Sequence, residues 1–153
     1  MLGEKEIVNS GCRYFIFRLC WVYDETGKNF MNTMLRLGKE REALNVVADQ
    51  IGAPTYAGDI AEATIKAIAK PKAKSGVYHF CNSGETSWAG FAEAIFKQAN
   101  LPTKVNPITT AEYPTPAKRP ANSRMNTTKF SATFGWDAIP SWQDGLKRCM
   151  TSL

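Results

Sequence analysis

The spacing of apolar residues predicts a chain in which short strands alternate with amphipathic helices. Apolar positions at helical spacing, delimited by turn formers and prolines, predict helices at residues 2–9, 29–39, 59–68, 88–99, 126–134 and 141–153. Short apolar runs predict strands at residues 14–19, 44–48, 77–81 and 104–108. This alternation predicts an α/β fold, and the small number of strands indicates part of a larger sheet.

Polar residues mark the expected starts of the later helices. Asp59, with Glu62 three residues on, is expected to cap the third helix, and Ser87 the fourth. Asn126 and Ser141 are expected to cap the last two. We therefore expect helix boundaries close to these four positions.

Two segments between these elements have the composition of structured loops. Residues 49–55 are rich in turn formers, and residues 113–120 contain three prolines, each of which biases its predecessor away from the helical region. Binding residues are often carried on such loops. We therefore expect ligand contacts from these two segments.

The composition is that of a folded globular chain. Its 153 residues fit one domain, with 44% hydrophobic and 22% charged residues. Every apolar run is shorter than the ~18 residues that a membrane helix requires, so we expect a cytoplasmic protein with no membrane partner. The four cysteines form no C-x-x-C pair and are expected to be free thiols, with no metal site.

The formal net charge is +5, with a cluster of Lys118, Arg119 and Arg124. No basic run reaches five residues and no aromatic RNA-binding motif occurs, so nucleic acid is not the expected partner. A nucleotide diphosphate needs only two or three well-placed cations and fits this pattern better. The alternative explanation for the positive net charge is that it balances acidic residues in parts of the protein outside this sequence.

The sequence lacks the common catalytic motifs of α/β enzymes. It contains no G-x-G-x-x-G turn for a dinucleotide pyrophosphate and no Tyr-x-x-x-Lys for proton exchange with a carbonyl oxygen. The lone histidine, His79, alternates with apolar neighbours and is more simply a strand residue than a member of a catalytic triad. We therefore expect no catalytic residue in these 153 residues.

Four segments, in order, resemble the dTDP-4-dehydrorhamnose reductases, a family of extended short-chain dehydrogenase/reductases. They are residues 17–23 with 29–31, 39–55, 76–80 and 113–123. The loop DQIGAPT at residues 49–55 and the stretch PAKRPANS at residues 116–123 are the most specific of these signals. The resemblance implies an incomplete Rossmann sheet plus a small substrate-binding lobe, with residues 1–153 as the substrate-binding carboxy-terminal region and the amino-terminal NADPH-binding domain absent.

The family's catalytic helix reads Tyr-x-x-x-Lys-x-x-Gly-Glu, and Gly3-Glu4 fits its last two positions. In this register the catalytic lysine falls immediately before Met1. The resemblance therefore implies a fragment, a misplaced start or a split gene, and a chain that is inactive alone.

The resemblance also assigns residues around the end of the first strand. It implies that Trp21 lies against the deoxysugar of the substrate, since an indole offers a flat apolar face and one N–H donor; a core tryptophan is the alternative. Cys20 is assigned to the cofactor side, where the family has a small residue, with a buried structural thiol as its alternative. Arg18 is expected to bind either ligand or a carboxylate or backbone partner.

Four further residues are assigned to the substrate. Asn29 opens a helix whose amino end favours phosphate, although capping alone also explains it. Arg119 is expected to bind diphosphate, because a guanidinium can contact two phosphate oxygens in one plane. Gln50 and Thr55 are expected to shape their loop first and contact the ligand second.

The implied partners are a dTDP-sugar and, in the intact enzyme, NADPH or NADH. The implied activity is reduction of dTDP-4-dehydro-L-rhamnose to dTDP-L-rhamnose. Some family members dimerise through magnesium, but Gly58 occupies an expected ligand position, so we do not expect magnesium here; self-association through exposed sheet surface stays open. The alternative function is a non-catalytic binding protein similar to the regulatory subunit of methionine adenosyltransferase.

Overall fold

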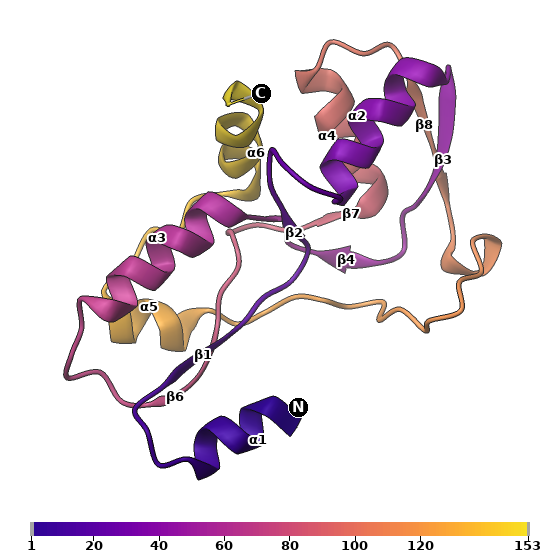
Figure 1. The fold of residues 1–153 in the computed structure, drawn as a ribbon. Coiled ribbons are helices and arrows are strands. Elements are labelled where there is room, and N and C mark those ends of the chain that lie inside the picture. The colour runs from indigo at the N-terminus through magenta and orange to yellow at the C-terminus, as the bar shows by residue number, and fades with distance from the viewer. Residues whose placement is uncertain (1, 153) are drawn as a thin grey trace.

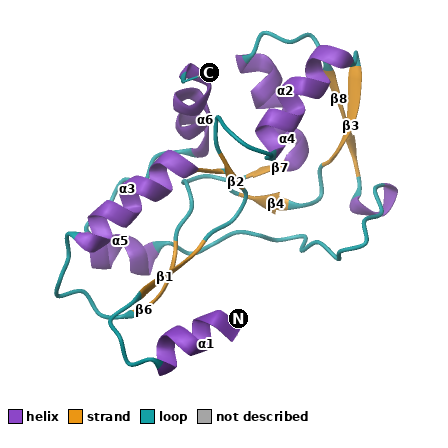
Figure 2. Cartoon of the chain, viewed as in Figure 1, coloured by secondary structure: helices purple, strands orange, loops and turns teal. Residues whose placement is uncertain are grey.

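The computed structural model describes residues 2–152 and has a mixed α/β fold with mainly parallel strand pairs (Figures 1 and 2). Its α-helices are α1 (Leu2–Asn9), α2 (Phe30–Glu40), α3 (Ala57–Ile68), α4 (Trp88–Gln98), α5 (Thr128–Phe134) and α6 (Trp142–Thr151). Its strands are β1 (Phe15–Arg18), β2 (Val22–Tyr23), β3 (Ala43–Val47), β4 (Ile51–Gly52), β5 (Thr55–Tyr56), β6 (Gly76–His79), β7 (Thr86–Ser87) and β8 (Lys104–Ile108). A short 3-10 turn spans Thr110–Glu112.

The strands form four two-stranded pairings in the described part of the chain. β1 pairs with β6, β2 with β5 and β3 with β8, all in parallel, and β4 pairs with β7 in antiparallel orientation. Parallel strands need a crossover connection, and helices supply it: α4, for example, lies between β3 and β8 in the chain. The predicted α/β class is therefore confirmed.

The two larger of three hydrophobic clusters define two regions of the molecule. The sheet region consists of α1, β1, α3, β6 and α5, and its buried cluster includes Tyr78, Phe80, Phe130 and Phe134. The lobe region consists of α2, β3, α4, β8 and α6, and its cluster includes Phe91. Figure 1 shows β1 and β6 beside α3 and α5 at one end, and β3 and β8 beside α2 and α4 at the other. The short strands β2, β4, β5 and β7 form the seam between the regions.

Several predicted boundaries are confirmed by their capping contacts. Ser87 caps α4 by accepting from the backbone N–H of Gly90, and Ser141 caps α6 by accepting from that of Asp144. Gly135 ends α5 in the left-handed conformation, with φ of 70°, which a glycine adopts without a Cβ clash. The strand at residues 104–108 has the predicted bounds.

The predicted role of Asp59 as a helix cap is wrong. α3 begins two residues earlier, at Ala57, with Tyr56 as its N-cap and no side-chain capping bond. Asp59 lies in the first helical turn and is fully buried, where its Oδ2 accepts from Arg148 Nη2 at 2.8 Å and from Asn82 Nδ2 at 2.6 Å. The local capping pattern was present, but a tertiary ion pair recruits the carboxylate instead.

Three smaller corrections concern element ends. The loop at residues 49–55 contains β4 and the start of β5, because its backbone pairs with β7 and β2. Asn126 does bond the first turn of α5 through Thr128 N–H, but Thr127 is the N-cap. α6 ends at Thr151, and the predicted end at Leu153, like Met1, lies outside the described residues.

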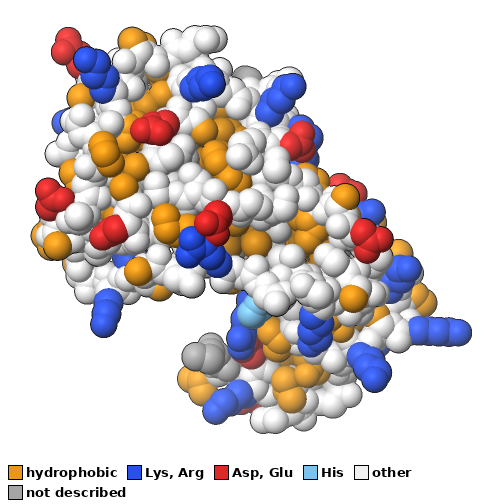
Figure 3. All heavy atoms as spheres, turned by 180° about the vertical axis from the view of Figure 1, so that it is seen from behind, with side chains coloured by type: hydrophobic (Ala, Val, Ile, Leu, Met, Phe, Trp, Pro, Cys, Tyr) orange, Lys and Arg blue, Asp and Glu red, His pale blue; other side chains and the backbone are white. Residues whose placement is uncertain are grey.

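The described helices include none that is both long and apolar enough to cross a membrane. In the view of Figure 3, the Lys and Arg side chains form no single stripe: they alternate with Asp and Glu over the upper part and outnumber them over the lower part.

Candidate functional site

The predicted site residue Trp21 stands just beyond β1 in a strained backbone conformation. Its φ is 46°, one of two positive values among the described non-glycine residues. A bulky residue in this left-handed region costs about 1–2 kcal/mol, so neighbouring contacts must hold it there. The Trp21 carbonyl accepts from Thr55 N–H at 3.0 Å, which fixes the turn against β5.

Trp21 belongs to an aromatic group formed with Trp88 and Phe30. The Trp21 and Trp88 rings are stacked, with centroids 3.7 Å apart and planes 14° apart. Phe30, the first residue of α2, lies 4.6 Å from the Trp88 ring. Both tryptophans are half-buried, so the group forms part of the surface as well as part of the packing. Such flat apolar faces suit the carbon skeleton of a sugar or a base.

The loop that precedes β5 lies against this aromatic group. Gln50 is buried and joins two elements: its Oε1 accepts from Trp88 Nε1 at 3.2 Å, and its Nε2 donates to Thr110 Oγ1 at 3.1 Å. Gly52 lies so close to Trp21 that a Cβ there would be 2.7 Å from indole Cε2. The loop sequence therefore allows the indole to approach the backbone.

Thr55 and Asn29 are both engaged in holding their own segments. Thr55 is fully buried, and its Oγ1 donates to the Ala53 carbonyl at 3.1 Å. Asn29 caps α2 through its Oδ1, which accepts from Asn32 N–H at 3.0 Å, while its Nδ2 donates to the Asp24 carbonyl at 2.8 Å. Asn29 thereby brings the amino end of α2, with Phe30, to the aromatic group.

Arg119 lies on the exposed, extended segment of residues 113–120. The chain just after it is anchored to β4, since Ile51 N–H donates to the Ala121 carbonyl at 2.9 Å and Ser123 N–H donates to the Ile51 carbonyl at 2.7 Å. The segment therefore runs beside the loop that contacts Trp21. Among residues 2–152, no hydrogen bond or ion pair engages the Arg119 side chain.

Arg124 and Arg18, the other cationic candidates, are paired with carboxylates. Arg124 forms a two-point ion pair with Glu85 at the edge of a hollow of about 300 Å³, and this pair lowers the pKa of Glu85. Arg18 forms a two-point pair with Glu4, with Nη2 2.7 Å from Oε2, which ties α1 to β1. Of the two alternatives for Arg18, a ligand or a protein partner, the structure shows the protein partner, the carboxylate of Glu4.

Cys20 is a buried thiol at the seam, next to Cys81 and Ala53. Its Sγ lies 3.3 Å from the Ala53 carbonyl oxygen. Hydrogen bonding to the Cys81 thiol lowers the pKa of Cys20 to about 7, and the same contact, with burial, raises the pKa of Cys81. Of the two thiols, Cys20 is therefore the one that ionises first, and Cys81 stays protonated.

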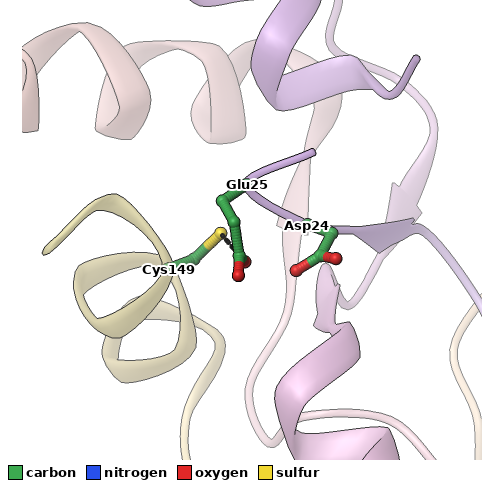
Figure 4. A group of neighbouring side chains, drawn as sticks. All are labelled: Asp24, Glu25 and Cys149. Carbon is green, nitrogen blue, oxygen red and sulfur yellow. Dashed lines mark hydrogen bonds between the residues drawn. The ribbon is translucent and has the colours of Figure 1, made fainter. Parts of the chain in front are cut away.

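One group of potential metal ligands occurs in the described part of the chain: Asp24, Glu25 and Cys149, whose ligand atoms lie within 4.8 Å of one another (Figure 4). A hydrogen bond between the two carboxyl groups raises the pKa of Asp24 and lowers that of Glu25. Burial raises the pKa of Cys149 to about 12, which disfavours the thiolate that a metal requires. We therefore assign no metal to this group.

Trp88 is the residue of this site that sequence reasoning missed. The sequence pattern predicts only that a helix starts at Trp88. It does not show that the large apolar side chain directly after the capping Ser87 contacts Trp21. That position places the half-buried ring at the amino end of α4, next to the buried face that carries Phe91 and Ile95. A tryptophan at a helix amino end was the available signal.

Comparisons with known proteins agree with this architecture. The model of the RmlD substrate binding domain matches residues 1–153. The chain is 44% identical to the dTDP-4-dehydrorhamnose reductase of Escherichia coli K12, over 100% of this chain and 54% of the relative. It is 48% identical to that of Aggregatibacter actinomycetemcomitans, over 95% of this chain and 52% of the relative.

A solved structure gives the same result in three dimensions. The dTDP-4-dehydrorhamnose reductase of Bacillus anthracis, crystallised in complex with NADP, superposes with a TM-score of 0.90 at 41% identity, over 98% of this chain and 52% of that protein. The chain thus spans about half the length of the relatives it matches. From its full-length match and its fold, the chain belongs to the RmlD substrate binding domain family.

Proposed function

We propose that this chain is the substrate-binding carboxy-terminal region of a dTDP-4-dehydrorhamnose reductase, which converts dTDP-4-dehydro-L-rhamnose to dTDP-L-rhamnose. The observation that carries the proposal is the family match over the whole chain, together with a half-buried aromatic face at Trp21. A sugar nucleotide offers an apolar ring face for such an indole and a diphosphate for a cation.

In this proposal each site residue has a separate task. Trp21 packs against the deoxysugar ring, and Arg119, whose side chain is exposed and engages none of the described residues, binds the diphosphate. Gln50 and Thr55 hold the loop beside Trp21, and Asn29 holds the amino end of α2, where backbone N–H groups favour an anion. Cys20 lines the cofactor side as a small buried residue.

NADPH, or NADH, would supply the hydride that reduces C4 of the sugar. The residues of this chain do not fit the dinucleotide on their own, because they include no glycine-rich strand-to-helix turn for its pyrophosphate. They also include no Tyr-x-x-x-Lys. The proposal therefore assigns cofactor binding and proton transfer to residues outside this sequence, and substrate binding to residues 1–153.

The test is an isotope-edited NMR titration of this chain, in which the tryptophan indole N–H signals are followed. dTDP-L-rhamnose should shift the Trp21 signal, and NADPH should leave it in place. UDP-glucose, which has a different base and sugar, is the control ligand. Absence of any response to dTDP-L-rhamnose would overturn the proposal that this region binds the sugar nucleotide.

Arg119→Ala tests the diphosphate contact, with Lys118→Ala as its neighbouring control. Loss of a charge-assisted contact should weaken dTDP-L-rhamnose binding about tenfold. Lys118→Ala removes the same charge one residue away and should have a much smaller effect. Equal losses in the two variants would indicate general electrostatic attraction instead of a specific contact.

A further inference from the structure

Trp88 is held at the site by two neighbouring elements. It is the first residue of α4, directly after β7, and β7 pairs with β4 so that Ser87 faces Ile51. The pairing places Trp88 beside Gln50, the residue that precedes β4. Its position is thus determined by the sheet seam as well as by its own helix.

Contacts from three separate segments converge on this one side chain. Its ring stacks on Trp21 from the end of β1 and lies against Phe30 from α2, while its Nε1 donates to Gln50 from the loop. The other two tryptophans differ: Trp136 and Trp142 are buried in the two hydrophobic clusters, and Trp142 Nε1 has no partner among the described residues. The stacked pair is therefore a distinct, partly exposed arrangement.

The unusual backbone conformation of Trp21 makes the orientation of its ring depend on the stack with Trp88. A φ of 46° is a conformation that a bulky side chain rarely adopts, so the indole is held in place by what it contacts. Trp88 covers one face of that indole with nearly parallel geometry. Without Trp88, the Trp21 ring would sample other rotamers and would lose that freedom on binding a ligand.

We propose that Trp88 is a positioning residue of the sugar-nucleotide site. Trp88 stacks on the Trp21 indole, is itself fixed by its hydrogen bond to Gln50, and so holds the indole in one plane for the deoxysugar ring. The inference rests on the proposed function, because it concerns how the same site orients the sugar. It assigns Trp88 an effect on the sugar and none on the nucleotide diphosphate, which Arg119 binds.

The stack itself is tested without ligand by circular dichroism. Two indoles at 3.7 Å should give an exciton couplet in the far ultraviolet. Trp21→Phe and Trp88→Phe should each abolish the couplet. Trp136→Phe, which removes a tryptophan from the sheet region, should leave it intact. Because the couplet vanishes when the two transition dipoles are parallel, ring-current shifts of the Trp21 ring protons in NMR are the second readout. A wild-type chain with neither a couplet nor upfield-shifted Trp21 ring protons would overturn the inference.

The role in binding is tested by calorimetry with dTDP-L-rhamnose and with dTDP. Trp88→Leu should weaken binding of dTDP-L-rhamnose about tenfold, as expected for loss of an aromatic stack, and should leave dTDP binding unchanged. Trp88→Phe retains a flat ring and should restore most of the affinity. Trp88→Met, which lacks a flat ring, carries the same prediction as Trp88→Leu if the latter does not fold.

The possible results separate this inference from the proposed function. Wild-type affinity for dTDP-L-rhamnose in Trp88→Leu would overturn the inference alone, and so would an equal loss for dTDP-L-rhamnose and dTDP, because that result indicates a merely structural role. A wild-type chain that shows the couplet but binds neither ligand would overturn the proposed function.

Discussion

The lobe region and the sheet region bury their apolar side chains to different extents. In the sheet region α1 buries none of its residues, and Leu2 is 80% exposed; α3 leaves Ile65 and Ile68 about as open, at 68% and 71%. In the lobe region α2, α4 and α6 pack their apolar faces on one cluster around the fully buried Phe91. The lobe has a closed core, whereas the sheet region has a core and an uncovered apolar surface.

The closed core of the lobe region explains why the candidate site is rigid. Trp88, Phe30 and the Gln50 loop are attached to lobe elements, while Trp21 lies between β1 of the sheet region and β2 of the seam. The site therefore lies at the seam, and most of its residues are carried by the lobe, whose helices and strands share one buried core. Sites attached to well-packed elements hold their geometry better than sites on free loops.

The largest effect is expected from opening the lobe core. Phe91→Ala removes a fully buried ring that contacts Tyr23, Phe30 and Trp142, and should lower the free energy of unfolding by about 3–5 kcal/mol. Leu2→Ala, on the uncovered surface of α1 in the sheet region, should change it by less than about 0.5 kcal/mol. Denaturant unfolding monitored by near-ultraviolet circular dichroism measures both. Similar losses in the two variants would contradict the contrast between the regions.

A smaller effect is expected where the two regions are linked. Asp59→Ala removes the buried acceptor on α3 that Arg148 of α6 and Asn82 both contact, and should cost about 2–3 kcal/mol of unfolding free energy. Asp144→Ala removes the exposed carboxylate that also pairs with Arg148 and should cost about 0.2–1 kcal/mol. If thermal and denaturant unfolding gave both variants the same loss, Asp59 would not be the link between the regions.

At pH 7 the smallest effect is a pH dependence at the seam, because the Cys20 thiol, with a pKa of about 7, is then only partly ionised. Because the folded-state pKa of Cys20, about 7, lies below its ordinary value of 9.0, the thiolate contributes stability that is fully present above pH 9.0 and lost as the pH falls through about 7. Thiolate absorbance in a Cys12→Ser background measures the titration directly, since the pKa of Cys149 is raised to about 12.

Cys81→Ala is the control for this titration. It removes the hydrogen bond that lowers the pKa of Cys20, so the titration midpoint should rise toward 9.0. An unchanged midpoint would show that hydrogen bonds with the Ala53 backbone and the Thr55 side chain, instead of the second thiol, lower the pKa of Cys20.

Most elements of the fold were predictable because their signals are local. Apolar spacing identified α2 and α4, and Ser87 and Ser141 identified two helix starts, since a capping hydroxyl acts on backbone groups only a few residues away. Asp59 shows the limit of this reasoning. Its cap pattern is a good one, but Arg148 lies 89 residues further along the chain, and local spacing carries no information on such a partner.

The candidate site was predictable in its parts and not in its assembly. The residue types and the resemblance pointed to Trp21, Gln50 and the DQIGAPT loop, and these do lie together. The stack on Trp88 depends on β4 pairing with β7, a contact between two-residue strands that leaves almost no pattern in the sequence.

Residue identity and short-range spacing are enough to establish the α/β class, the family resemblance and the absence of the dinucleotide and Tyr-x-x-x-Lys motifs. The pairing of Arg18 and Arg124 with carboxylates, the link from α3 to α6 through Asp59, and the stack of Trp21 on Trp88 become visible only in the folded chain. Charge pairing and ring stacking depend on distances between segments remote in the chain, and folding alone sets those distances.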